Sequence, residues 1–275
     1  MRILCVIVLY KQKLFDSISY NKVVKGLDKS DAVGLFVYDN SPSPMHLSKE
    51  FEDSNLVYVS DVTNPGVSKA YNEGAKYAKE KEYDWILILD QDTDFQDNEY
   101  IDFCVKSAEE HPDEVLFVPR VYYGDNVILS PLPTRHHIAY QKEIIPNEAH
   151  PLNHVSIINS GTLIRTDTFI EAGGYNENVP LDFSDHQFFE RLKKKVGRFF
   201  LMDYTLYQSF SNKVDDIISL KVRFKYFCRG AKNYDAGITS KIDIFFVVIK
   251  RWMSLSFRTK SFEFTKILIT NFIRK

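Results

Sequence analysis

Asp84-Trp85-Ile86-Leu87-Ile88-Leu89-Asp90-Gln91-Asp92-Thr93 joins an apolar run of strand length to two acids spaced one residue apart. The run over residues 85–89 has no alternating polar positions, which is typical of a strand buried inside a parallel sheet. Open α/β sheets bind ligands at the carboxyl ends of their strands, and Asp90 and Asp92 would lie there.

Asp90 and Asp92 are spaced to share one ligand, because residues i and i+2 of an extended segment project to the same side. Carboxylate oxygens suit Mg²⁺ or Mn²⁺, which complete their coordination with water and substrate phosphates. The pair therefore indicates a divalent-metal site that carries a diphosphate. A strand followed by an acidic turn explains the same pattern without any function. The acids that follow, Asp94 and Asp97, are interpreted as solvated loop charges.

Apolar runs alternate with helical patterns on both sides of this strand. We expect strands at 3–10, 32–38, 56–60 and 115–118 and helices at 15–27 and 100–110, with a further helix that Asn64 or Ser68 caps. This alternation predicts a doubly wound α/β domain over residues 1–120. Asp39 follows the second strand, so parallel strands would bring it to the edge that holds Asp90. An Asx turn is an equal interpretation of Asp39.

The periodicity fades over residues 122–154, where four prolines break the segment, and we expect a variable, substrate-facing loop with a hairpin. The adjacent His136 and His137 would point to opposite sides of a strand, which argues against a shared metal site. Strand character returns at 155–164, interrupted by Ser160-Gly161. A glycine inside a strand often marks the close approach of a ligand or another backbone.

Asp185 precedes a helical pattern over residues 186–195, and a final strand is expected at 198–203. An Asp at a helix N-cap stabilises the helix without any further role. The functional alternative is a general base that the N-terminus of the helix keeps ionised and oriented. The residues alone leave both interpretations open.

The composition is that of a globular protein, with 275 residues, 44% hydrophobic and 26% charged. Its three cysteines are widely spaced without a metal-ligand pattern, and the apolar start lacks a signal-cleavage site, so a cytoplasmic location is expected. No run of 18 apolar residues occurs, which argues against a membrane-spanning helix.

Charge is divided unevenly along the chain. Residues 213–275 contain 14 Lys/Arg and 5 Asp/Glu, a net charge of +9, whereas the first 212 residues carry −11. Residues 217–232 and 241–257 have helical patterns rich in aromatic and basic side chains. A helix packed on the core with a solvated face would explain them. An interfacial helix docked on anionic lipid explains the charge as well, and predicts peripheral attachment at the inner face of the cell membrane.

Side by side, these stretches resemble the inverting family 2 glycosyltransferases of the GT-A fold, above all the bacterial rhamnosyltransferase-type members that build surface polysaccharides. The resemblance covers about residues 3–203 in the family's order. It is carried by Val37-Tyr38-Asp39-Asn40-Ser41, Asn64-Pro65-Gly66-Val67-Ser68-Lys69-Ala70-Tyr71-Asn72-Glu73-Gly74, Leu89-Asp90-Gln91-Asp92-Thr93, Asn159-Ser160-Gly161-Thr162, Gly173-Gly174-Tyr175-Asn176-Glu177 and the block from Asp185 to Arg191.

The resemblance implies a Rossmann-like fold with a mostly parallel central sheet flanked by helices. Residues 1–120 would form its nucleotide-sugar-binding half, residues 121–212 its acceptor-binding and catalytic half, and residues 213–275 a basic helical extension.

The resemblance also implies roles for individual residues. Asp185 would deprotonate the acceptor hydroxyl, and Asp92 would hold Mg²⁺ or Mn²⁺ on the diphosphate. The substrate- and nucleotide-binding residues would be Tyr10, Asp39 at the nucleobase, Asn64, Gly66, Asn72, Asp90 at the nucleoside, Ser160, Gly161, Asp182 and Arg191, which supports the catalytic loop.

Two positions depart from the family pattern. Many relatives carry a metal-binding His after the last strand of the core, where Gln208 stands here, so the metal coordination differs. The family's acid before the catalytic Asp is Ser184 here, and Asp182 is the candidate to compensate for it.

The implied reaction moves a sugar from a nucleotide-diphosphate donor to a glycan or lipid-linked glycan. The sequence Asp90-Gln91-Asp92-Thr93 favours dTDP-rhamnose over a UDP-hexose as the donor.

A non-catalytic nucleotide-binding relative is the alternative that Gln208 supports. A nucleotidyltransferase would need a glycine-rich loop after the first strand, and Tyr10-Lys11-Gln12-Lys13 has no glycine. No nucleic-acid recognition motif accompanies the basic tail, and the oligomeric state is left open.

Overall fold

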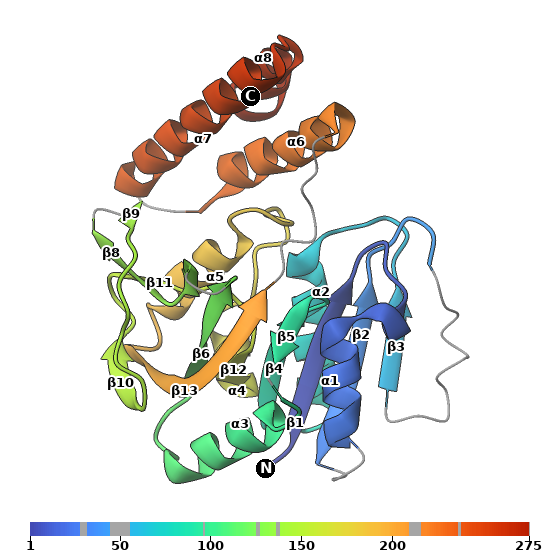
Figure 1. The fold of residues 1–275 in the computed structure, drawn as a ribbon, viewed down its shortest axis with the longest axis vertical. Helices are drawn as coiled ribbons and strands as arrows, with labels where there is room; N and C mark the ends of the chain where they lie inside the picture. Colours follow the sequence, from blue (N-terminus) through green and yellow to red (C-terminus); the bar gives the residue numbers. More distant parts are fainter. Residues whose placement is uncertain are drawn as a thin grey trace.

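A ten-stranded mixed sheet lies at the centre of the chain and is covered by helices on both faces (Figure 1). The computed structural model describes residues 1–27, 32–44, 56–95, 97–124, 127–135, 138–208, 216–235 and 238–274. The strand order is β10-β13-β6-β12-β4-β1-β2-β3, with β5 paired to β13 and β7 to β6. These strands are β1 (Ile3–Leu9), β2 (Val33–Asp39), β3 (Leu56–Ser60), β4 (Trp85–Asp90), β5 (Thr93–Phe95), β6 (Leu116–Tyr123), β7 (Val127–Ser130), β10 (Glu148–Pro151), β12 (Thr162–Arg165) and β13 (Arg198–Gln208).

The helices follow the predicted alternation closely. They are η1 (Leu14–Asp16), α1 (Ile18–Leu27), α2 (Val67–Glu80), α3 (Tyr100–Glu110), α4 (Thr166–Glu171), α5 (Ser184–Leu192), α6 (Ile217–Asn233), α7 (Ile238–Thr259), α8 (Glu263–Leu268) and a terminal π-helical turn, η3 (Ile269–Ile273). The expected hairpin region forms β8 (Leu132–Arg135) and β9 (Ile138–Ala139), which join β11 (Val155–Ser156) in a small second sheet.

Strand alternation explains why the central strands are apolar throughout. Odd-numbered residues of β1 pack with side chains of α1 and α3, and even-numbered residues pack with α2, α4 and α5. Both faces are therefore buried, as a parallel strand in a doubly wound sheet requires. Helix α2 lies especially close, because a Cβ at Gly74 would stand 2.7 Å from Val6 Cγ1.

The sheet is mostly parallel, as expected, although β4 has one neighbour of each kind. Strands β3, β2, β1 and β4 are parallel to one another, whereas β12 runs antiparallel between β4 and β6. The carboxyl ends of the four parallel strands point toward the C-terminal helices in Figure 1. Any ligand bound at this edge would therefore lie between the sheet and those helices.

Helices α6, α7 and α8 pack around a hydrophobic cluster of their own, which includes Phe224, Phe227, Val248 and Phe264. Phe183 is partly buried and packs against the same cluster, so the extension contacts the loop in front of α5. Within the described ranges, no helix combines the length and the apolar character needed to cross a bilayer.

Several expectations about element ends were wrong. Neither Asn64 nor Ser68 caps α2, because Gly66 occupies the N-cap and the Ser68 hydroxyl donates to Val179 O at 2.5 Å. Asp185 lies inside the first turn of α5, and the N-cap is Phe183 in a left-handed conformation. The last core strand continues to Gln208 because β5 pairs with its second half. His136 and His137 lie outside the described residues.

Candidate active site

The register of the sheet brings the predicted acids to one edge. Asp90 pairs with Val8 of β1, and Asp39 pairs with the next residue, Leu9. Gln208 pairs with Thr93 of β5, so the end of β13 lies directly beside the Asp90–Asp92 turn. Residues more than a hundred positions apart in the chain thus meet at the carboxyl ends of the parallel strands.

Neutral donors surround the Asp90 carboxylate. The Tyr71 hydroxyl donates to Oδ1 at 2.9 Å, the Ser160 hydroxyl donates to Oδ2 at 2.5 Å, and the Gln208 amide donates to Oδ2 at 3.2 Å. Tyr71 and Ser160 are almost completely buried. These three bonds hold the carboxylate in one orientation while leaving its negative charge uncompensated.

Asp92 lies in the turn between β4 and β5, so the extended geometry expected for the two acids was wrong. Partial burial and the charge of Asp90 nevertheless raise the pKa of Asp92 to about 6, against a smaller opposite effect of the Gln208 hydrogen bond. The two carboxylates are therefore close enough to repel each other, as a shared ligand requires.

Asp185 faces the same group of acids from α5. Burial and the charge of Asp90 raise the pKa of Asp185 to about 7, although hydrogen bonds from Ser184 and Asn159 lower it. The Ser184 hydroxyl donates to Oδ1 at 3.0 Å. When the Asn159 amide nitrogen is turned toward Asp185, it lies 2.6 and 2.9 Å from the two carboxylate oxygens.

The segment before α5 is held by two of the predicted substrate-binding residues. The Asn72 amide bonds the backbone of Tyr175 in both directions, at 2.8 and 3.0 Å, and also donates to Glu177. Arg191 donates to the carbonyls of Gly173 and Gly174. Both side chains thereby fix the loop that carries Tyr175, whose ring stacks on that of Phe188.

Asp39 is fully buried at the end of β2. Its carboxylate accepts the Tyr58 hydroxyl at 2.5 Å and the Ser41 backbone N–H at 2.8 Å. The Ser41 hydroxyl in turn accepts the Lys11 N–H at 2.7 Å. Asp39 therefore orders the loops after β1 and β2, and a nucleobase contact by its side chain stays a prediction.

Tyr10, Asn64 and Gly66 lie along the same edge. Tyr10 is 43% exposed, and its backbone N–H donates to the Gln91 side chain at 2.8 Å. Asn64 and Gly66 both have positive φ, and a Cβ at Gly66 would stand 2.2 Å from Pro180 O. The turn before α2 thus touches the loop that leads to Asp185.

Gly161 and Asp182 contact residues outside the group of acids. A Cβ at Gly161 would stand 2.2 Å from Leu206 Cδ1, and the Tyr100 hydroxyl donates to the Gly161 carbonyl. The Asp182 carboxylate lies 3.9 Å from Arg223 of the extension. Their predicted substrate roles are not tested by these contacts.

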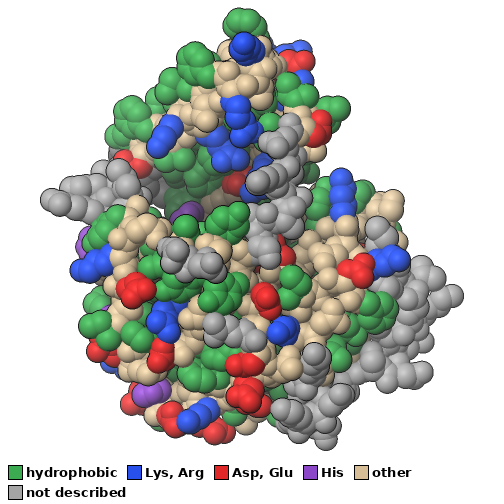
Figure 2. Space-filling view, in the orientation of Figure 1, with side chains coloured by type: hydrophobic (Ala, Val, Ile, Leu, Met, Phe, Trp, Pro, Cys, Tyr) green, Lys and Arg blue, Asp and Glu red, His purple; other side chains and the backbone are tan. Residues whose placement is uncertain are grey.

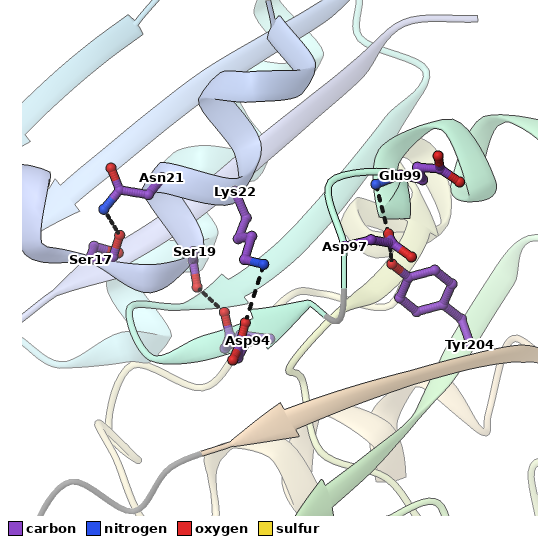
Figure 3. A network of polar contacts seen from close by, with 9 residues as sticks. Ser17, Ser19, Asn21, Lys22, Asp94, Asp97, Glu99 and Tyr204 are labelled. Atoms are coloured by element: carbon purple, nitrogen blue, oxygen red, sulfur yellow. Dashed lines mark hydrogen bonds and ion pairs between the residues drawn. The ribbon is translucent and has the colours of Figure 1, made fainter.

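Figure 3 shows the acids that follow Asp92. Asp94 lies in β5 and pairs with Lys22 of α1 at 3.7 Å. The Asp97 carboxylate accepts the Glu99 N–H at 2.8 Å and the Tyr204 hydroxyl. Asp97 is exposed in the loop before α3, as expected of a solvated charge, although its hydrogen bonds also tie the start of α3 to β13. The expectation of a loop was wrong for Asp94, which lies in a strand.

The donor set at Asp90, Asp92 and Gln208 fits a hard divalent cation. In the part of the chain that the structure describes, no Lys or Arg forms an ion pair with Asp90, Asp92 or Asp185, and no three His, Cys, Asp or Glu side chains form a preformed metal cluster. A divalent cation would relieve the repulsion that raises the pKa of Asp92. Water and a diphosphate would then complete its coordination.

Three residues of this site were missed as site residues from the sequence. They are Tyr71 and Asn159, which bond Asp90 and Asp185, and Tyr175, whose hydroxyl bonds the Asn159 side chain at 3.2 Å. Each lies inside a motif of the family resemblance in which another residue was assigned the role. The sequence therefore indicated the segment that would reach the site, whereas the hydrogen bonds of these three residues depend on the packing of α2 and α5.

The sequence model described as Glycosyl transferase family 2 matches residues 28–173. No curated protein matches the chain significantly. The S. aureus TarS 1–349 structure is 16% identical, with a TM-score of 0.54 over 95% of this chain and 74% of that one. Its complex with UDP-GlcNAc is 14% identical, with a TM-score of 0.57 over 98% and 79%.

GalNAc-T7 with UDP, GalNAc and Mn²⁺ is 12% identical, with a TM-score of 0.58 over 82% of this chain and 47% of that one. The chain matches 45% of the longer TarS structure. At these identities, the structural similarities establish the fold, and the sequence match over residues 28–173 establishes the family. The chain belongs to glycosyl transferase family 2 and is a glycosyltransferase with the GT-A fold.

Proposed function

We propose that this glycosyltransferase transfers a sugar from a nucleotide-diphosphate donor to a hydroxyl of a glycan or lipid-linked glycan in bacterial surface polysaccharide synthesis. The transfer inverts the configuration at the anomeric carbon. The observation that carries the proposal is Asp185, whose pKa is raised to about 7 beside Asp90. A general base is most effective when its pKa lies near the working pH. Asp185 combines this property with a position next to the acids at the carboxyl edge of the sheet.

The reaction proposed is a single displacement. The acceptor oxygen attacks the anomeric carbon while its proton passes to the Asp185 carboxylate. The bond from that carbon to the diphosphate breaks, and the nucleotide diphosphate leaves with the electron pair. Attack opposite the leaving group inverts the carbon without a covalent enzyme intermediate. A divalent ion held by Asp92 and Gln208 would neutralise the charge of the departing diphosphate.

The donor is proposed to be dTDP-rhamnose, because of the sequence of residues 90–93, with a UDP-hexose as the alternative. TarS and GalNAc-T7 were solved with UDP or a UDP-sugar, which supports the alternative. Gln91 favours neither donor, because its amide exchanges hydrogen bonds with the Tyr10 backbone.

A donor screen for hydrolysis tests the proposal. Incubation with dTDP-rhamnose and with UDP-hexoses, each with Mg²⁺ or Mn²⁺ and with chelator, is expected to release nucleotide diphosphate from one donor only when metal is present. Release from dTDP-rhamnose supports the rhamnosyl assignment, and release from a UDP-sugar replaces it. A chain that neither hydrolyses nor binds any donor in calorimetry would instead be the non-catalytic relative.

We also propose that the extension contacts an anionic membrane. Helix α7 exposes an apolar stripe, Ile242, Phe246, Met253 and Phe257, whose spacings of 4, 7 and 4 residues keep it on one side. These side chains are 41–79% exposed, whereas Ile244, Val248 and Leu255 of the same helix are buried. The surplus of basic residues beyond position 212 favours anionic lipid over a second copy, which would carry the same charge.

The double variant Phe246→Ser/Phe257→Ser is expected to bind anionic vesicles at least about 10²-fold more weakly, since immersing each Phe contributes roughly 1.5–3 kcal/mol and two are replaced. Co-sedimentation of the full chain with vesicles of phosphatidylglycerol and phosphatidylcholine measures this. Phe15→Ser is the matched control, because Phe15 is 55% exposed on the α/β body. Equal binding of the double variant and the wild type would contradict the stripe as a membrane contact.

A further inference from the structure

The extension is bonded to the loop that carries the proposed base. Asn233 of α6 donates to Asn178 O at 2.9 Å, and Asn176 donates back to Asn233 O at 3.2 Å. A Cβ at Gly230 would stand 2.6 Å from Asp182 O, so α6 lies against the loop backbone. The Phe183 ring packs 4.8 Å from that of Phe227. These contacts place α6 against the loop that leads to Asp185.

Two arginines, Arg223 and Arg251, lie near Asp182 at this contact, and a third, Arg258, lies near Arg251. Arg223 of α6 lies 3.9 Å from Asp182, and Arg251 of α7 stacks 4.7 Å from the Phe227 ring. Burial and the charges of Arg223 and Arg258 lower the pKa of Arg251, while the charge of Asp182 raises it. Arg258 follows Arg251 by seven residues and therefore lies on the same side of α7.

The cluster of Arg223, Arg251, Arg258 and Asp182 carries more positive than negative charge. Of the residues that the structure describes, Asp182 is the one carboxylate shown to act on Arg251, whereas the like charges of Arg223 and Arg258 repel it. Among the residues that the structure describes, Nε of Arg251 and Oδ2 of Asp182 are buried without a hydrogen-bond partner. Figure 2 shows Lys and Arg side chains gathered where the C-terminal helices face the body across a hollow. An anion at this place would compensate the charge.

Arginine is suited to one class of anion in particular. Its planar guanidinium offers paired donors that match the oxygens of a phosphate group. The donor diphosphate is assigned to the metal at Asp90 and Asp92, so these arginines have no part in holding it. Asp182 precedes Asp185 by three residues, so a phosphate bound here would lie close to the base.

Resting on the proposed function, we propose that Arg223, Arg251 and Arg258 form a phosphate-binding subsite for the acceptor, beside the catalytic loop. The subsite holds a phosphate or diphosphate group of the acceptor while Asp185 takes the proton from its hydroxyl. It selects acceptors that carry phosphate near the accepting sugar, as a glycan linked to lipid through a diphosphate does. The apolar stripe of α7 is a separate surface, used for the membrane.

Inorganic pyrophosphate is the probe for the test. Calorimetry of the full chain in chelator, which removes the metal-dependent donor site, is expected to show binding by the wild type. Arg223→Gln/Arg258→Gln is expected to weaken it about tenfold or more, since each guanidinium removed takes away charge-assisted hydrogen bonds to the phosphate oxygens. Arg223 and Arg258 are both exposed, so the variant should fold, which its melting temperature checks.

Lys241→Gln/Lys250→Gln is the matched control, because it removes the same charge from exposed positions of α7. An equal loss in the control, or no binding by the wild type, would overturn the subsite. Anionic vesicles separate the two sources of phosphate: loss of vesicle binding by the arginine variant, with pyrophosphate binding unchanged, would assign the cluster to lipid headgroups instead. Metal-dependent donor hydrolysis by the wild type tests the proposed function separately, so a failed subsite is distinguishable from a failed proposed function.

Discussion

Asp185→Asn is expected to lower the rate of sugar transfer by about 10³-fold while nucleotide binding changes less than about twofold, in line with the 10²- to 10⁴-fold contribution of a general base. Asn keeps the shape and the hydrogen bonds with Ser184 and Asn159 but cannot accept the proton. Turnover and calorimetric nucleotide affinity, measured on the same preparation, separate these effects. Parallel loss of both would mean that Asp185 holds the donor rather than the proton.

Glu190→Gln is the control for this variant. Glu190 lies on the same helix, and its carboxylate pairs with Lys193 at 2.6 Å. Its removal changes the charge of α5 by the same amount without touching the acids of the site. We expect transfer by this variant to stay within about twofold of the wild type, because a surface ion pair contributes little.

The same carboxylate predicts the pH dependence of the wild-type enzyme. Transfer requires ionised Asp185, and its pKa is raised to about 7. The ratio kcat/KM should therefore rise with pH and level off above about 7. Ser184→Ala removes a hydrogen bond that lowers this pKa, so its profile should move to higher pH. An unchanged profile in this variant would contradict the assignment of the ascending limb to Asp185.

Stability should change in the opposite direction from activity. The pKa of Asp185 rises from 3.8 to about 7 on folding, so its contribution to stability is present below pH 4 and is lost as the pH rises through 7. Asp185→Asn removes this loss. In chelator at pH 8, we expect the variant to be more stable by about 1–3 kcal/mol, with little difference at pH 4. Denaturant unfolding at both values measures it, and a destabilised variant at pH 8 would contradict the buried charge.

The carboxyl edge of the sheet could be predicted because local patterns determine it. The apolar run before Asp90 needs burial on both faces, and that requirement leads to a central strand with its acids at the ligand-binding end. The turn at Asp92 was missed because an acidic pair does not distinguish an extended segment from a tight turn. What matters for a shared ligand is that the two carboxylates lie near each other, and the charge of Asp90 still acts on Asp92 in the turn.

Apart from Ser160 and Gln208, which the resemblance named as site residues, the partners of the acids could not be predicted, because tertiary packing supplies them. Tyr71 resembles any other aromatic residue of an amphipathic helix until α2 packs on the sheet and turns its hydroxyl toward Asp90. Gln208 reaches the site because β13 is longer than its apolar pattern and pairs with β5. Asp182 was assigned to the substrate as the acid that could compensate for Ser184, and that role stays a prediction. Its contact with Arg223 was not expected, because the docking of α6 has no signature in the sequence.

Asp92→Asn should lower metal-dependent transfer by about 10²- to 10³-fold, because a metal at the leaving diphosphate contributes several kcal/mol to the transition state. Chelation of the wild type should cause a loss of similar size, and added Mg²⁺ or Mn²⁺ should restore the wild type far better than the variant. The measurement is the initial rate as a function of metal concentration. A variant that needs more metal but reaches the full rate would show that Asp92 only raises metal affinity.

Asp94→Asn is the matched control, since it alters an acid two residues away that pairs with Lys22 instead (Figure 3). Its metal dependence should be that of the wild type. If chelator left the wild-type rate unchanged and Asp92→Asn were fully active, the assignment of a metal to this site would be wrong. The charge of the departing diphosphate would then require cations of the chain itself. The three arginines of the extension would become candidates for that role, and pyrophosphate binding in chelator would report on the leaving group rather than on the acceptor.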